Sequence, residues 1–338
     1  MNRASAGRGR PTLDSVAARA GVSRATASRV VNGMTVTPTS AESVRRAVEE
    51  LGYVPNHAAR TLVTQRTDLL ALVLPEATTR VFSDDQFFPG VIHGVSQQLE
   101  AADKQLVLML AGSPASHDRI ERSIAAHHVD GVMLASLHGA DPLPAALTRI
   151  GIPVVCNERS LGPTSPPYVG VDNVGGAATA VRHLLDTGRT RIATIAGPQD
   201  MIGGIDRLTG YRDALRDSAR RSIIAVGDFT LDSGAVAMRQ LLADDPALDA
   251  VFVASDLMAD GALQALRQAG RRVPDDIAVI GFDDIALAQY TDPPLTTIRQ
   301  PIMEIGRQMA RQLLRLIAGE EIEPIMTLPT ELVVRRSA

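Results

Sequence analysis

Three short apolar runs of the chain each end in polar residues that could bind a polyhydroxylated molecule. The runs are 154–156, 250–254 and 278–282, and the residues that follow them are Glu158, Arg159, Ser255, Asp256, Asp283 and Asp284. Arg207 lies just inside the start of an expected helix that follows another apolar run, 191–196. Carboxylates accept hydrogen bonds from hydroxyl groups and arginine donates in a fixed fork. Together these side chains could satisfy the vicinal hydroxyls of a sugar in a desolvated pocket.

These residues need a scaffold, and from Asp68 onward the sequence alternates between short apolar runs and helical segments. Strands are expected at 69–74, 106–110, 131–134, 154–156, 191–196, 223–226, 250–254 and 278–282, with helices at 90–101, 117–127, 143–150, 175–185, 205–217, 234–242 and 260–270. Continuous apolar strands joined by helical crossovers predict two doubly wound parallel sheets in tandem. Ligands of such sheets bind beyond the carboxyl ends of the strands, so two facing sheets create a cleft.

Not every polar residue at these strand ends is expected to meet a ligand. For Asp172, Asp256 and Asp284, capping of a helix explains the residue type as well as binding does. For Arg207 together with Asp283, ligand binding is the favoured interpretation.

The segment from Thr12 to Asn32, TLDSVAARAGVSRATASRVVN, predicts two short helices and a tight turn. Thr12 and Ser23 can cap the two helices, and Gly21 ends the first. The side chains left facing outward on the second helix are Arg24, Ala25, Thr26, Ser28, Arg29 and Asn32. Such donors and methyl groups suit base edges and phosphates in a major groove. The alternative is an ordinary helical hairpin.

The charge distribution favours DNA binding over that alternative. Residues 1–66 contain ten arginines and four acidic residues, a net charge of +6, whereas the rest of the chain carries −10 and the whole chain −4. A basic first segment on an acidic body is typical of a modular nucleic-acid-binding protein. The opening residues 1–10, rich in Gly, Ser and Arg, are expected to be a disordered tail.

Composition bounds the remaining possibilities. A length of 338 residues with 45% hydrophobic content is enough for two or three packed domains. The one cysteine, Cys156, has no disulfide partner in the chain, and no signal peptide or membrane-spanning run is visible, so a cytoplasmic location is expected. No catalytic motif occurs, and His127 with His128 lacks further ligands at metal-binding spacing. We therefore expect no enzyme activity, no metal and no cofactor.

A third helix is expected to begin at Thr37-Pro38 and end at Gly52, and Asn56 could cap a short fourth helix. That fourth helix is too short to be stable alone, so a partner chain and DNA together could hold it.

At this point the chain resembles the lactose-repressor (LacI/GalR) family of bacterial transcription regulators. The resemblance is carried by TLDSVAARAGVSRATASRVVNG, LGYVPNHAARTL and GFDDIALAQYTDPPLTTIRQP, and it extends over nearly the whole chain. It implies an all-α helix-turn-helix headpiece followed by an α/β effector module of two parallel-sheet lobes, similar to periplasmic sugar-binding proteins. The chain departs from the family in carrying Glu158, where aspartate is common, and in a longer segment at 78–86.

The resemblance also implies roles for individual residues. Base contacts would come from Arg24, Ala25, Thr26 and Arg29, and phosphate contacts from Thr12, Ser23, Ser28, Asn32, Tyr53 and Asn56. Ala59 and Leu62 would enter the minor groove, where a paired leucine wedge kinks the duplex. Effector contacts would come from Phe87 or Phe88, Glu158, Arg207, Ser255 and Asp283.

The expected domains are the tail at 1–10, a DNA-binding domain at 11–55, a hinge at 56–67 and an effector and dimerisation domain at 68–338. Within the last, lobe 1 would comprise about 68–168 and 300–325, and lobe 2 about 169–299 and 326–338.

The expected function is a dimeric repressor that binds a pseudo-palindromic operator and is controlled by a small molecule, with a sugar favoured over a purine or other small metabolite. The chain shows no heptad leucine tail, which favours a dimer over a tetramer. The alternatives from other classes are a solute-binding module and a sugar-modifying α/β enzyme.

Overall fold

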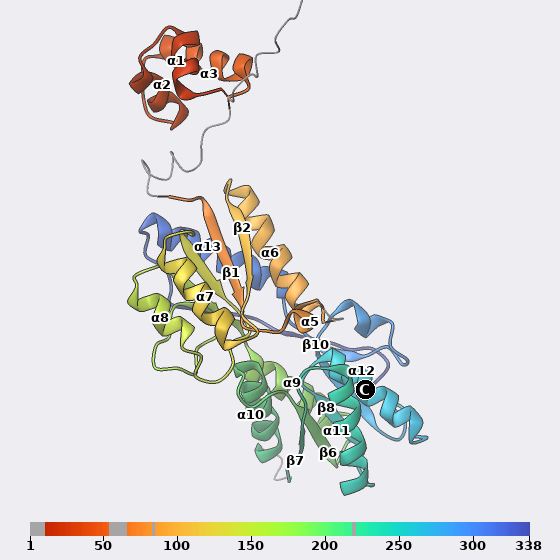
Figure 1. The fold of residues 1–338 in the computed structure, drawn as a ribbon. Coiled ribbons are helices and arrows are strands. Elements are labelled where there is room, and N and C mark those ends of the chain that lie inside the picture. Colours follow the sequence, from red (N-terminus) through yellow and green to blue (C-terminus); the bar gives the residue numbers. More distant parts are fainter. Residues whose placement is uncertain (1–10, 54–65, 83–84, 218–220) are drawn as a thin grey trace, which may run out of the picture. The chain divides into compact units, whose positions relative to one another are not determined.

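The computed structural model describes residues 11–53, 66–82, 85–217 and 221–338, and it divides into two compact units, 1–67 and 68–338 (Figure 1). The expected tail at 1–10 and most of the expected hinge lie outside the described residues. Asn56, Ala59 and Leu62 are among them, so their predicted roles remain predictions.

The first unit contains the helices α1 (Leu13–Ala20), α2 (Arg24–Val31) and α3 (Pro38–Leu51), coloured red and orange in Figure 1. Thr12 caps α1 in a capping box with Ser15, and Gly21 ends it at φ 69°, a left-handed conformation that glycine adopts without strain. The Ser23 side chain accepts a hydrogen bond from the Thr26 backbone N–H and caps α2. These caps lie where the sequence pattern predicts them.

A small apolar core holds the three helices together. Its buried members are Val16, Ala17, Ala27, Val44 and Ala47. Since three of these are alanine or small valine side chains on α1 and α2, the two helices can approach closely enough to present a compact outer face.

Lobe 1 of the second unit is built on a parallel six-stranded sheet of order β11-β5-β4-β3-β1-β2. Its strands are β1 (Leu69–Leu74), β2 (Gln105–Leu110), β3 (Gly131–Leu134), β4 (Val154–Asn157), β5 (Tyr168–Val171) and β11 (Ile325–Leu328). Helices α6 (Phe87–Ala101) and α13 (Ile302–Ala318) cover one face, and α7 (Pro114–Ala125) and α8 (Leu143–Arg149) cover the other. The short helix α5 (Thr78–Val81) precedes α6.

Lobe 2 is built on a second six-stranded sheet, of order β12-β10-β9-β8-β6-β7. Its strands are β6 (Ile192–Ala196), β7 (Ile223–Val226), β8 (Ala250–Val253), β9 (Ala278–Asp283), β10 (Thr296–Arg299) and β12 (Glu331–Val333). Helices α9 (Asn173–Asp186) and α10 (Ile202–Asp217) cover one face, and α11 (Leu231–Asp244) and α12 (Asp256–Gln268) cover the other. A short 3-10 helix, η1 (Ala286–Gln289), follows β9.

The fold agrees with the predicted class, but two details differ. The edge strand β12 runs antiparallel to β10, so the second sheet is not purely parallel. Strands β5 and β11 both belong to the first sheet, so the expected lobe boundaries near 168 and 325 lie about three residues too early. Both strands are only four residues long, and the Pro-rich approach to β5 hides its apolar pattern.

The chain passes from one lobe to the other after β5, after β10 and after β11. Within the described residues, no helix is both long and apolar enough to cross a bilayer.

Candidate functional site

The outer face of α2 presents the residues that sequence analysis assigned to DNA. Arg24, Ala25 and Arg29 are exposed, whereas Thr26 and Ser28 are partly buried. Thr26 Oγ1 lies 2.9 Å from Ser23 Oγ, and Asn32 Nδ2 donates to Ser28 Oγ at 3.3 Å. Thr12 is exposed and Tyr53 packs against the headpiece core through its ring. The face therefore combines exposed arginines with short, partly buried hydroxyl side chains.

Arg24 has a charged neighbour within the headpiece. Its Nε lies 3.3 Å from Asp14 Oδ1, and about two thirds of each side chain is exposed to solvent. Exposed pairs of this kind contribute roughly 0–1 kcal/mol, so DNA could displace Asp14 at little cost.

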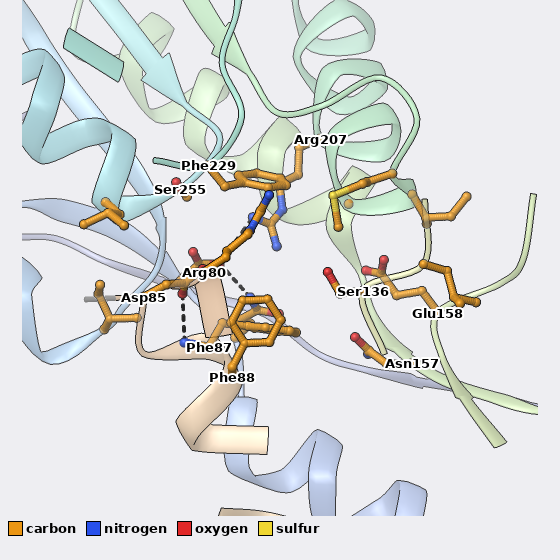
Figure 2. A pocket seen from close by; sticks show the side chains of 18 of the residues that line it. Arg80, Asp85, Phe87, Phe88, Ser136, Asn157, Glu158, Arg207, Phe229 and Ser255 are labelled. Carbon is orange, nitrogen blue, oxygen red and sulfur yellow. Dashed lines mark hydrogen bonds and ion pairs between the residues drawn. The ribbon is translucent and has the colours of Figure 1, made fainter. Parts of the chain in front are cut away.

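In the second unit, a pocket lies between the two lobes at the carboxyl ends of their strands (Figure 2). It contains about 740 Å³ of space between atoms, part of which is open to solvent. The six residues predicted to bind an effector all line it: Phe87, Phe88, Glu158, Arg207, Ser255 and Asp283.

Arg207 is the best-anchored cation of this pocket. It is 6% exposed, and its Nη1 donates to the Ala254 carbonyl at 2.6 Å and lies 3.2 Å from Asp283 Oδ1. Its guanidinium carbon lies 3.7 Å from the centre of the Phe282 ring. Because the guanidinium is held on several sides, its remaining donors have a fixed direction toward the pocket.

Glu158 connects lobe 1 to this arginine through a shared partner. Asn173 Nδ2 donates to Glu158 Oε1 at 2.6 Å, while Asn173 Oδ1 accepts from Arg207 Nε at 2.9 Å. Burial raises the pKa of the Glu158 carboxyl, although Arg207 and Asn173 act in the opposite direction. The pair presents a carboxylate and a guanidinium from opposite lobes to the same space.

Asp283 sits at the end of β9 with φ 115°, a conformation that side chains other than glycine rarely adopt. Gln300 Nε2 donates to its Oδ1 at 2.6 Å. Burial raises the pKa of the Asp283 carboxyl to about 7, opposed by Arg207 and reinforced by Asp85. A carboxyl in this position can either accept from or donate to a ligand hydroxyl near neutral pH.

Sequence analysis missed several pocket residues, among them Arg80, Asp85, Asn157, Phe229 and Gln300. Phe229 comes shortly after the end of β7, as Glu158 does after β4. It was missed because the sequence analysis looked for polar side chains at strand ends, and Phe229 is apolar. Its φ is 67°, and its ring occupies the space that a side chain at Gly197 would need, with Cζ 2.3 Å from an ideal Cβ there. A glycine at the end of β6 therefore makes room for an aromatic wall.

The longer segment at 78–86 brings Arg80 and Asp85 to the pocket. The Arg80 guanidinium carbon lies 6.0 Å from the Phe229 ring centre, and Asp85 Oδ1 accepts from the Phe87 backbone N–H at 2.9 Å. In Figure 2 the Arg80 side chain runs across the middle of the view, between Phe229 and Phe87. Residues of this segment thus form part of the lobe 1 wall of the pocket.

The other polar residues that follow strands have different roles, some as helix caps and some as partners of neighbouring side chains. Asp172 caps α9, and Ser255 caps α12 while also lining the pocket. Asp256 instead accepts from Thr297 Oγ1 at 2.5 Å, and Asp284 pairs with Arg299 and Arg335. Arg159 lines the pocket while its guanidinium forms a bidentate pair with Asp206.

Cys156 is fully buried in the lobe 1 core, and burial raises the pKa of its thiol to about 12. Among the described residues, no group of three or more His, Cys, Asp or Glu side chains could hold a metal ion.

Two family models match the chain. Residues 12–56 match the bacterial regulatory proteins of the lacI family, and residues 181–338 match a periplasmic binding protein-like domain. The first match covers the headpiece. The second covers most of lobe 2 together with α13 and β11 of lobe 1.

Among curated proteins, the chain is 50% identical to the HTH-type transcriptional regulator CelR of Thermobifida fusca, over 98% of this chain and 99% of the relative. Among solved structures, it resembles a transcriptional regulator CelR–cellobiose complex at 47% identity and a TM-score of 0.78, covering 97% of this chain and all of that one. It also resembles the lac repressor dimer bound to operator and the anti-inducer ONPF, at 26% identity and a TM-score of 0.85, covering 97% and 99% of the two chains.

A DNA-binding headpiece joined to a two-lobed binding module defines a class of transcription regulators. The chain belongs to the LacI family of bacterial regulatory proteins.

Proposed function

We propose that this protein is a dimeric repressor whose affinity for an operator is controlled by a sugar bound between the two lobes. The observation that carries the proposal is the pocket itself, where Arg207 and Asp283 from lobe 2 face Glu158 and the two phenylalanines of lobe 1. Buried carboxyl and guanidinium groups beside aromatic rings suit a ligand with many hydroxyls and apolar ring faces.

The sugar we favour is a β-linked glucose disaccharide. The CelR structure that the chain resembles at 47% identity is a complex with cellobiose. Polar side chains are available on both sides of the pocket, since Figure 2 shows Asp85 and Ser255 at one side and Glu158 and Asn157 at the other, with Phe229 and Arg80 between them.

For operator binding, we infer that two headpieces place their α2 helices in successive major grooves of a pseudo-palindromic site. Arg24, Ala25, Thr26 and Arg29 would contact bases, and Thr12, Ser23, Ser28, Asn32 and Tyr53 would contact phosphates. The exposure of Arg24, Ala25 and Arg29 on α2 supports this assignment. Asn56, Ala59 and Leu62 complete the proposed interface by their place in the sequence.

The control is proposed to act through the lobes. An effector that contacts both lobes favours one arrangement of them, and operator affinity changes if the two headpieces are positioned differently in that arrangement.

The test has two stages. An operator is first selected from a random duplex library with the purified full-length protein at low salt. Binding of the selected duplex is then followed by fluorescence anisotropy in the presence of cellobiose, maltose or glucose. We expect cellobiose to change operator affinity at least tenfold, the size of a typical coupling between sites, and maltose and glucose to act weakly. If the protein binds duplex DNA and none of the three sugars changes the affinity, the assignment as a DNA-binding regulator stands and the sugar effector is rejected.

A further inference from the structure

His138 lies between two carboxylates that belong to opposite lobes. It follows β3 in lobe 1, where its Nε2 is 3.1 Å from Oε1 of Glu76, a residue that follows β1. Its Nδ1 is 3.0 Å from Oδ2 of Asp200, which lies between β6 and α10 in lobe 2. The next residue, Gly139, donates its backbone N–H to the Asp200 carbonyl at 2.7 Å. The imidazole therefore forms part of a direct connection between the lobes.

The geometry of this connection specifies the protonation state of the ring. An ionised carboxylate oxygen only accepts hydrogen bonds, so each ring nitrogen must carry a hydrogen to bond its neighbour. Only the imidazolium has hydrogens on both nitrogens. A neutral ring would turn a lone pair toward one of the two carboxylates, and that contact would become repulsive. In agreement, the hydrogen bonds that the ring donates to Glu76 and Asp200 raise the pKa of His138 against the opposing effect of burial.

The carboxylate on the lobe 1 side contacts two residues of the pocket lining. Glu76 is 6% exposed, and its Oε1 also accepts from Ser136 Oγ at 2.6 Å. Its Oε2 lies 3.6 Å from Arg80 Nε. Ser136 and Arg80 both line the pocket, so the same carboxylate connects the pocket lining to the contact between the lobes.

The charged and titratable groups around His138 come from every element packed near it. Glu76 and Arg80 precede α6, Asp200 lies on lobe 2, and His117, Asp118 and Asp141 line an open groove on the outer side of the ring. His117 Nε2 lies 2.8 Å from the Ala111 carbonyl, and Asp141 accepts from the Leu143 N–H. Glu76 and Asp200 are thus the carboxylates in hydrogen-bonding contact with the ring, and both favour its cation.

We propose that His138 is an interlobe latch and that binding of an effector between the lobes is coupled to uptake of a proton by its ring. The inference rests on the proposed function, because Glu158 and Arg207 line one pocket in the same arrangement of the lobes that forms the latch. Protonation of His138 favours that arrangement, and the latch weakens as pH rises through the elevated pKa of the ring.

The first test needs no ligand. The full-length protein is labelled with ¹³C at histidine Cε1, and the His138 resonance is assigned by its loss in His138→Gln and titrated by NMR. We expect a pKa above the ordinary histidine value of about 6.5, and a lower pKa in Asp200→Asn. An ordinary pKa that Asp200→Asn leaves unchanged would overturn the latch.

The second test measures cellobiose affinity by calorimetry between pH 6 and pH 9. We expect affinity to fall by about two- to fivefold more in the wild type than in His138→Gln, the size of a half-exposed ion pair. His128→Gln is the control, since His128 is exposed in the segment between α7 and β3 and should keep the wild-type profile. The wild type and His138→Gln both keep Asp85, Glu158 and Asp283, so the difference between their pH profiles isolates the effect of His138.

Parallel pH profiles for wild type and His138→Gln would contradict the coupling. Failure of cellobiose to bind either protein at any pH would instead reject the proposed effector, and the titration without ligand would still decide whether the latch exists.

Discussion

Arg207 and Asp283 form a buried ion pair in the floor of the pocket, with Nη1 and Oδ1 3.2 Å apart and both residues less than a tenth exposed. The backbone of Asp283 has a strained φ of 115°, and the Arg207 guanidinium lies against the Phe282 ring. Such a pair stabilises the fold little, because removing two charges from water costs about as much as their attraction returns. Its position at the carboxyl end of β9 is instead what a binding site requires.

Arg207→Gln should abolish the response to the effector while operator binding is retained. The substitution removes the fixed donors and leaves the Asp283 carboxyl without its cation, a change that costs roughly 3–5 kcal/mol when a buried pair is broken. An effector affinity more than 100-fold weaker, measured by calorimetry, is the expected result. Arg212→Gln on the exposed side of the same helix is the control. Wild-type effector affinity in Arg207→Gln would remove this arginine from the site.

The stability of the effector module should decrease as pH rises from about 4 to about 7. Burial raises the pKa of Asp283 to about 7, above the unfolded value of 3.8, so the native state binds the extra proton. Stability from this group is fully present below the unfolded pKa and is lost as pH rises through the native pKa. Burial also raises the pKa values of Asp85, Glu158 and Asp256, with the same sign.

Urea denaturation at several pH values measures this slope. Asp283→Asn cannot ionise and should show a shallower dependence between pH 5 and pH 7. An equal slope in both proteins would show that another group controls the titration.

Arg24→Ala should weaken the selected operator by roughly 5- to 150-fold, the range that one good base contact provides. Affinity for unrelated duplex DNA should fall much less. Arg46→Ala removes the same charge from the exposed side of α3 and tests whether the loss is merely electrostatic. If each variant loses affinity for the operator and for unrelated duplex DNA by the same factor, Arg24 contacts phosphate and does not read a base.

Gly94→Ala should destabilise lobe 1. An ideal Cβ at this position would lie 1.9 Å from the Met303 carbonyl oxygen, so α6 and α13 would have to move apart. Overpacking of this kind costs about 1–3 kcal/mol, measurable as a lower midpoint of thermal unfolding. Ser96→Ala, two residues along on the exposed side of α6, should unfold at the wild-type temperature. An unchanged midpoint in Gly94→Ala would mean that the helices accommodate the methyl group.

Much of the fold could be predicted because buried parallel strands are nearly continuous apolar runs. Strands such as β1 and β3 were therefore predicted at the bounds that the structure shows. Strands β5, β10, β11 and β12 were missed, since they are short and all of them adjoin the segments that cross between the lobes. Helix α13 was missed as well, although its buried face contains Ile305, Met309 and Leu313 at helical spacing.

The pocket was predictable to the extent that its residues follow strand ends. Glu158, Ser255 and Asp283 obey that rule. Arg80 reaches the pocket from α5, Asp85 from the residues just before α6, and Asn173 reaches Arg207 from the start of α9, so no local pattern identified them. The interlobe contact between His138 and Asp200 joins residues 62 positions apart, and only tertiary structure brings them together.

The most direct test of the account is operator affinity of the full-length protein measured with and without cellobiose, in the wild type and in Arg207→Gln side by side. The account predicts tight, salt-sensitive operator binding by both proteins and at least a tenfold change with cellobiose in the wild type alone. Failure of the wild type to bind any duplex at low salt, or an identical sugar response in both proteins, would contradict it.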